Sequence, residues 1–239
     1  MMMTRYLIEA PTDEVISLDL VKSHLRVTGS DKDELIQVMI DAAVQTLDPA
    51  GDGWLGRALR PQTWEVRCDG FPYRYTGDGY HRNFRTLHAG AIELPYPPLL
   101  SVESVKYDDG SGVEQSLAEN TGYRVFGVGA KHKAYIAPVP NGTWPSGARC
   151  DFESVRVRFR AGYAKPEAGS EDTDTLPAAV KQSILLTTSN LWSLAERSLF
   201  LAEEDVTGVM VRRWVVSDAP AKIIAAAAEN LLTGLRVFD

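Results

Sequence analysis

The 239-residue chain is poor in the features that mark a membrane, secreted or metal-binding protein. Its two cysteines, Cys68 and Cys150, are too few for a disulfide framework and are not spaced as metal ligands. No apolar run approaches the roughly 18 residues of a membrane-spanning helix, and the first residues lack the apolar core of a secretory signal. We therefore expect synthesis in the cytoplasm and two buried or unreactive thiols.

Positive charge is also scarce, because 25 Lys and Arg residues face 32 Asp and Glu residues, which leaves a net charge of −7. Affinity for nucleic acid depends on basic side chains that displace counterions from phosphates. The charge balance therefore argues against a protein whose main task is to bind nucleic acid, and DNA that passes this chain should not adhere to it. The apolar content of 44% is enough for one large or two small cores.

Motifs for catalysis or metal binding are missing. The segment 127–131 lacks the further residues of a phosphate-binding loop, and 108–112 lacks the spaced carboxylates of a calcium loop. The acidic run 203–205 stands in polar surroundings, where carboxylates are solvated rather than poised for acid–base chemistry. The histidines are scattered at His24, His81, His88 and His132. We expect no catalytic residue, no metal, no cofactor and no enzymatic activity.

Helical periodicity dominates the first sixty residues. Ser17 is placed to cap a short helix that ends at Gly29, and Ser30 is placed to cap a second helix. A further helical turn is predicted for 54–59. The apolar face of the second helix is expected to comprise Leu35, Met39, Ala43 and Leu47.

From Gln62 to Gly162 the apolar residues recur with a period of two, which is typical of β-strands. Pro95, Pro97 and Pro98 fix the backbone and lack N–H donors, so this segment predicts a corner between two strands. Asp109-Gly110 predicts a tight hairpin turn with a positive φ, and 73–87 predicts a long exposed loop. The predicted strands are Thr63–Cys68, Ala91–Leu94, Val102–Tyr107, Glu114–Leu117, Tyr123–Phe126, Ala134–Pro138 and Ser154–Arg160.

The last of these strands alternates most clearly. One face carries Val155, Val157 and Phe159, and the other carries Arg156, Arg158 and Arg160. These arginines are candidates for pairing with acidic groups of a neighbouring subunit. Ordinary solvent exposure is the alternative interpretation.

After an acidic linker at 165–175 the chain returns to helix. Pro177 fits the first turn of a helix that reaches Arg197, and a strand is possible around 209–215. Arg212, Arg213 and Trp214 have the composition of an interface centre, or of a surface strand end with a core Trp. A closing helix is expected from Ser217 or Asp218, with an apolar stripe of Ile224, Ala228, Leu231, Leu235 and Phe238.

These elements predict an α+β fold in which a small helical bundle is interrupted by an inserted antiparallel β-domain and followed by a C-terminal docking helix. The expected division is 1–61 for the N-terminal helices, 62–163 for the β-domain, and 164–239 for the linker, a bundle helix and the docking helix.

Several blocks also resemble a known family when taken in order. They are LDLVKSHLRV, DKDELIQVMIDAA, GRALRPQTWEV, IELPYPPLLSVESVKYDDGSG, YRV, VRVRFRAGYA and LPAAVKQSILL. Together they resemble the head–tail connector (adaptor) proteins of tailed bacteriophages and gene transfer agents. The chain departs from that pattern in the 48–53 insertion, the 73–87 loop and the length after Arg197.

The resemblance implies a non-enzymatic virion component at the head–tail interface. Members of the family assemble as rings, commonly of twelve copies, beneath the portal, where they extend the DNA channel and offer a platform for stopper and tail components. The implied partners are the portal protein, stopper or tail-terminator components and further copies of the chain. DNA would pass through during genome ejection without sequence-specific binding, and no membrane is involved.

Two sets of residues are candidates for these contacts. The β-domain, with Arg156, Arg158 and Arg160, is expected to face neighbouring copies in the ring. The expected portal contact comprises Arg212, Arg213, Trp214, Ile224, Leu231, Leu235 and Phe238.

The alternative function is that of a tail-tip or baseplate module. It would use Tyr73, Tyr75 and Tyr80 to bind a host protein or glycan.

Overall fold

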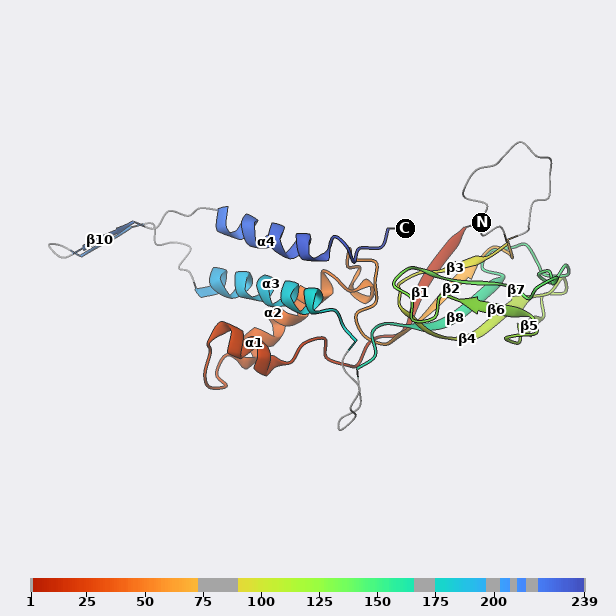
Figure 1. Ribbon diagram of the computed structural model, residues 1–239, viewed down its shortest axis with the longest axis horizontal. Helices are drawn as coiled ribbons and strands as arrows, with labels where there is room; N and C mark the ends of the chain where they lie inside the picture. Colours follow the sequence, from red (N-terminus) through yellow and green to blue (C-terminus); the bar gives the residue numbers. More distant parts are fainter. Residues whose placement is uncertain are drawn as a thin grey trace.

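The two periodicities of the sequence correspond to two units that lie end to end along the molecule's long axis (Figure 1). The computed structural model describes residues 2–72, 90–165, 175–196, 203–206, 210–213 and 219–238. The predicted 73–87 loop, most of the linker and Trp214 lie outside these residues. Each unit has its own hydrophobic core, and the mixture of helices and antiparallel sheets confirms the α+β class.

The first two helices are α1 (Leu18–Leu25) and α2 (Asp33–Gln45). Ser17 caps α1 as predicted, since its hydroxyl accepts from the Leu20 N–H at 3.4 Å. The predicted capping of α2 by Ser30 is wrong: Lys32 occupies the N-cap and makes no side-chain cap bond. A backbone turn from the Asp33 N–H to the Ser30 carbonyl precedes the helix instead.

The buried face of α2 is rotated from the predicted stripe. Ile36 and Ile40 are buried with Met39 and Ala43, whereas Leu35 is 46% exposed. A helix turns once in 3.6 residues, so a strict four-residue spacing drifts around its surface. Beyond α2, a single 3₁₀ turn, η1 (Pro49–Gly51), replaces the helical turn that was predicted for 54–59.

The remaining helices are α3 (Ala178–Glu196) and α4 (Ala219–Leu232), and α3 packs against both α2 and α4. The helical core draws Val21, Ile36, Val180, Ile184 and Leu232 from the four helices. The predicted C-terminal helix starts close to where expected but ends at Leu232, and the following residues run as a non-helical tail to Phe238.

A short antiparallel pair, β9 (Glu203–Val206) and β10 (Met210–Arg213), lies between α3 and α4 in the sequence. Arg212 is opposite Glu204 in the register, and Arg213 is opposite Glu203. Figure 1 shows β10 beyond the ends of α3 and α4, on the side away from the β unit.

The larger sheet of the β unit has the strand order β1-β2-β8-β4-β5, with every neighbouring pair antiparallel. Its first strand was not predicted from the sequence and precedes the helices in the chain. The strands are β1 (Met3–Glu9), β2 (Gln62–Cys68), β8 (Val155–Ala161), β4 (Leu99–Asp108) and β5 (Glu114–Leu117).

The smaller sheet has the order β3-β7-β6, with β3 (Ile92–Leu94), β7 (Ala134–Pro138) and β6 (Tyr123–Phe126). Side chains of both sheets form one core, in which Val157 and Phe159 meet Ile92 and Ile136. All seven predicted strands are therefore present, with ends displaced by at most a few residues.

The proline-rich segment forms the predicted corner, because Pro95–Pro98 connects β3 of the small sheet to β4 of the large one. The β4–β5 turn differs in detail from the prediction. Its positive φ of 79° belongs to Gly112 rather than to Gly110. The Asp109 carboxylate closes the turn by accepting from the N–H groups of Ser111 and Val113 at 2.9 and 3.0 Å.

Candidate functional site

The segment 48–64, which we call the waist, connects the helical unit to the β unit. Asp48 is 3% exposed and organises this segment with its carboxylate. It accepts from the Ala50 N–H at 2.9 Å, the Leu59 N–H at 2.8 Å and the Gln62 amide at 3.0 Å. Burial raises the pKa of Asp48 although all three donors act to lower it. This carboxylate is therefore a structural acceptor that fixes the path of the waist.

Two buried arginines join the waist to distant parts of the chain. Arg60 donates to the carbonyls of Glu14 and Val15 at 2.9 and 3.2 Å, just ahead of α1. The Arg57 guanidinium is 3% exposed and donates in three directions. It reaches the Leu235 carbonyl at 2.9 Å, the Lys131 carbonyl at 2.6 Å and the Tyr163 hydroxyl at 3.2 Å.

The C-terminal tail binds directly to the waist. The Val237 N–H donates to the Leu55 carbonyl at 3.0 Å. Gly56 has a φ of +67°, and a Cβ at this position would lie 2.4 Å from the Val237 carbonyl oxygen. Glycine at residue 56 is therefore needed both for its backbone conformation and for the close approach of the tail.

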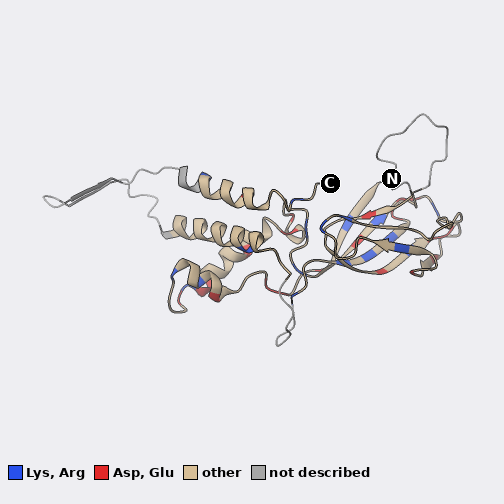
Figure 2. Ribbon diagram, viewed as in Figure 1, with Lys and Arg blue, Asp and Glu red and all other residues tan. Residues whose placement is uncertain are grey.

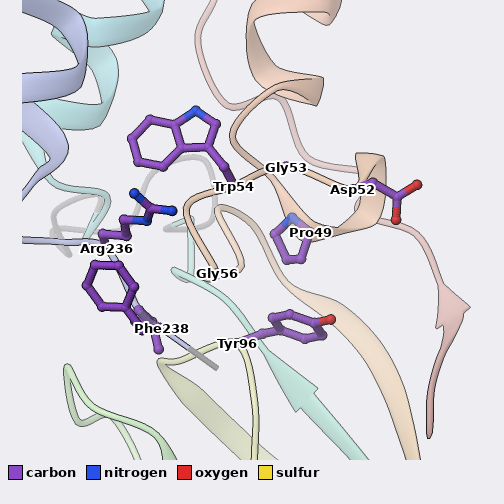
Figure 3. Close-up of a pocket in the computed structure, with 9 residues that line it drawn as sticks. Pro49, Asp52, Gly53, Trp54, Gly56, Tyr96, Arg236 and Phe238 are labelled. Atoms are coloured by element: carbon purple, nitrogen blue, oxygen red, sulfur yellow. The ribbon is translucent and has the colours of Figure 1, made fainter. Parts of the chain in front are cut away.

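A hollow of about 300 Å³, which we call the waist pocket, lies where the waist, the tail and the β3–β4 corner meet. Figure 3 shows the Arg236 side chain between the rings of Trp54 and Phe238, with Tyr96 on another wall. The Arg236 guanidinium carbon lies 5.3 Å from the Trp54 ring centre and 4.7 Å from that of Phe238. Trp, Tyr and Arg are the residue types that dominate protein interfaces energetically. The pocket is lined by Pro49, Asp52, Gly53, Trp54, Gly56, Tyr96, Arg236, Val237 and Phe238.

The candidate portal residues on α4 and the tail divide into buried and exposed groups. Ile224 is half-buried, and Leu235 packs against the helical core. Leu231 is 42% exposed and Phe238 is 69% exposed, so these two apolar side chains remain accessible to a partner.

The rest of that predicted set lies elsewhere. Arg212 and Arg213 are on β10, at the opposite end of α4 from the tail (Figure 1). The 14 residues of α4 alone span about 21 Å. The structure therefore does not bring Arg212 and Arg213 into one patch with Leu235 and Phe238, and Trp214 lies outside the described residues.

The predicted arginine face is present on the outer side of the five-stranded sheet, and Figure 2 shows Lys and Arg positions in blue on the strands of the β unit. Two of the three arginines have partners within the chain. Arg156 pairs with Asp108 at 2.5 Å and Glu114 at 3.1 Å, and Arg158 pairs with Glu65 at 2.9 Å. Arg160 is exposed and has no ion pair among the described residues. The role of these arginines at a subunit contact stays a prediction.

The same face continues to β1 through Glu153. Its carboxylate accepts from the Tyr6 hydroxyl at 2.6 Å and the Thr4 hydroxyl at 3.1 Å, and pairs with Arg67 at 2.8 Å. The Tyr6 hydrogen bond, followed by that of Arg67, lowers the pKa of Glu153 to about 2. Sequence reasoning missed these partners because they come from strands far apart in the chain.

The thiol and the possible metal ligands of the described residues can be assessed directly. Burial raises the pKa of the Cys68 thiol to about 12, so this side chain is not a nucleophile at neutral pH. Within the described ranges no three His, Cys, Asp or Glu side chains are grouped as metal ligands. The helices in these ranges are too short or too polar to cross a membrane.

Comparisons with known proteins agree with the resemblance noted from the sequence blocks. Residues 15–63 match the family described as Phage gp6-like head-tail connector protein. This match covers α1, α2 and the waist up to the start of β2. No curated protein sequence matches the chain significantly.

Two solved structures have a similar fold. A chain of "Virion of native gene transfer agent (GTA) particle" is 19% identical with a TM-score of 0.56, and the alignment covers 98% of this chain and 96% of that one. A chain of "Neck of empty GTA particle computed with C6 symmetry" gives the same identity and TM-score, with 99% and 96% covered. The predicted resemblance to phage and gene transfer agent head–tail connectors is confirmed.

Proposed function

We propose that this chain is a structural, non-enzymatic component of a virion neck, an adaptor that binds beneath the portal. The proposal rests on two matches that agree with each other. Residues 15–63 match a head–tail connector family, and nearly the whole chain shares its fold with a chain of a gene transfer agent particle.

In this proposal the chain repeats around the particle axis as a ring. The similar chain in the neck of the empty particle belongs to an assembly computed with C6 symmetry. A ring of twelve copies, which the family resemblance implies, is compatible with sixfold repetition. The ring would extend the DNA channel and support stopper or tail components, and the net charge of −7 per copy would discourage DNA from adhering.

The accessible apolar side chains at the C-terminal end of α4 and in the tail favour this region as the portal contact. Phe238 and Leu231 are exposed, and Phe238 borders the aromatic waist pocket with Arg236. Exposed aromatic and arginine side chains beside a pocket are the groups that partner proteins bind most strongly. Arg212 and Arg213 would belong to a separate contact at the far end of α4.

The test is co-elution of the purified chain with its portal protein in size-exclusion chromatography. We expect the wild-type chain to co-elute and the double variant Leu231→Ser/Phe238→Ser to bind at least about tenfold more weakly, as interface anchors typically do. Val113→Ser is the matched control, because Val113 is 55% exposed in the distant β4–β5 turn. A wild-type chain that never co-elutes with the portal would refute the adaptor function.

A further inference from the structure

The helical unit has two open edges. α3 packs against both α2 and α4, and Figure 1 shows α4 on one side of α3 with α1 and α2 on the other. α4 is therefore covered on its α3 side and forms one edge of the unit, while α1 and α2 form the opposite edge. Apolar side chains on these edges have no cover among the described residues.

Part of the apolar surface of α4 is exposed and is not buried by its packing against α3. Ala228 and Leu232 are buried, whereas Ile223 is 68% exposed and Ala226 and Ala227 are also exposed. At about 100° per residue, the exposed three fall on a face that is rotated well away from the buried two. We call Ile223, Ala226 and Ala227 the α4 outer face.

α2 has a corresponding face on the opposite edge. Val38 is 60% exposed and Leu35 is 46% exposed, and one further turn along the helix Ala42 is exposed too. These residues recur at the spacing of one helix face and stand apart from the buried Ile36 and Ile40. We call Leu35, Val38 and Ala42 the α2 outer face.

We propose that the α4 outer face of one copy packs against the α2 outer face of the next copy in the ring. The inference rests on the proposed function, since it names the surfaces by which the copies meet. Because the two faces lie on opposite edges, the contact is head-to-tail and leaves both outer edges of every pair free to add another copy. Such a contact closes into a ring when the rotation between copies allows it.

The two helices of the proposed contact run in the same direction. Both helices run toward the waist: α2 leads into it, and the tail after α4 bonds to Leu55. The two outer faces therefore pack in parallel, so that the N-terminal turns of α4 and of the next copy's α2 lie side by side.

The contact is small, since it involves one helix pair about 20 Å long, whereas stable interfaces bury about 800 Å² per partner. We therefore expect free copies to associate weakly and to meet through these faces when the portal holds them side by side.

Cysteine cross-linking tests the contact directly. The double variant Val38→Cys/Ile223→Cys, in a Cys150→Ser background that removes the exposed native thiol, is assembled on the portal and treated with a bismaleimide. We expect a ladder of covalent multimers that neither single-cysteine variant gives. The matched control is Val113→Cys/Ile223→Cys, because Val113 is similarly exposed but lies in the β unit.

The outcomes separate the inference from the function on which it rests. If many copies add to the portal but the Val38–Ile223 pair cross-links no better than the control, the α2–α4 contact is wrong and the adaptor function stands. If many copies do not add to the portal, the adaptor function fails and the contact fails with it. A ladder specific to the double variant supports both.

Discussion

At the scale of single residues, the waist depends on positions where one residue type fits. Gly56→Ala would force an alanine into a backbone conformation with positive φ and would place its Cβ too close to the Val237 carbonyl oxygen. We expect a loss of about 1–3 kcal/mol in the free energy of unfolding, measured by chemical denaturation. Gly147→Ala is the control and should change it by no more than about 0.5 kcal/mol, since nothing lies within 4 Å of its Cβ. Equal losses of stability in Gly56→Ala and Gly147→Ala would show that the tail does not lie close to Gly56.

Glu153 should make the attachment of β1 depend on pH. Its folded-state pKa of about 2 lies below the ordinary value of 4.5. The stabilisation is therefore fully present above pH 4.5 and is lost as the pH falls toward 2. The difference in Tm between the wild type and Glu153→Gln should shrink over that interval, with the exposed Glu103→Gln as control. A difference that stays constant from pH 6 to pH 2 would contradict the assigned contacts.

At the scale of secondary-structure elements, two adjacent residues of α4 differ in role: one packs in the core and the other is exposed for docking. Leu232 is fully buried in the helical core, whereas its neighbour Leu231 is 42% exposed. We expect Leu232→Ala to lower the free energy of unfolding by about 2–5 kcal/mol, and Leu231→Ala to lower it by less than about 1 kcal/mol. Urea denaturation of both variants measures this, and similar losses would place Leu231 in the core instead.

The strands were most predictable where buried and more exposed side chains alternate, as they do in Val155–Ala161. β1 was missed because it is an edge strand whose side chains are mostly exposed, which removes that alternation from the sequence. The stripe through Leu235 and Phe238 predicted more helix than exists, because the non-helical tail also packs Leu235 on the core. The waist pocket was beyond prediction, since it joins residues from 49 to 238 through tertiary contacts.

At the scale of the whole molecule, the two units are joined not only by covalent connections but also by buried hydrogen bonds that side chains of the waist donate. Arg57 binds the tail, the β6–β7 turn and Tyr163 at once. One consequence concerns truncation after Asp218, which would remove Leu232 and the packed Leu235 from the helical core. Loss of portal binding by that truncation would therefore not identify a docking surface, and the exposed-residue substitutions are the sharper test.

The proposed adaptor function requires many copies of this chain to add to a portal. The most direct measurement is mass photometry of the purified chain, of its portal protein, and of their mixture. We expect the mixture to gain the mass of a ring of about twelve copies of the 26.3 kDa chain, a number taken from the family resemblance and compatible with sixfold repetition. A mixture whose masses are those of the separate components at every concentration would contradict it.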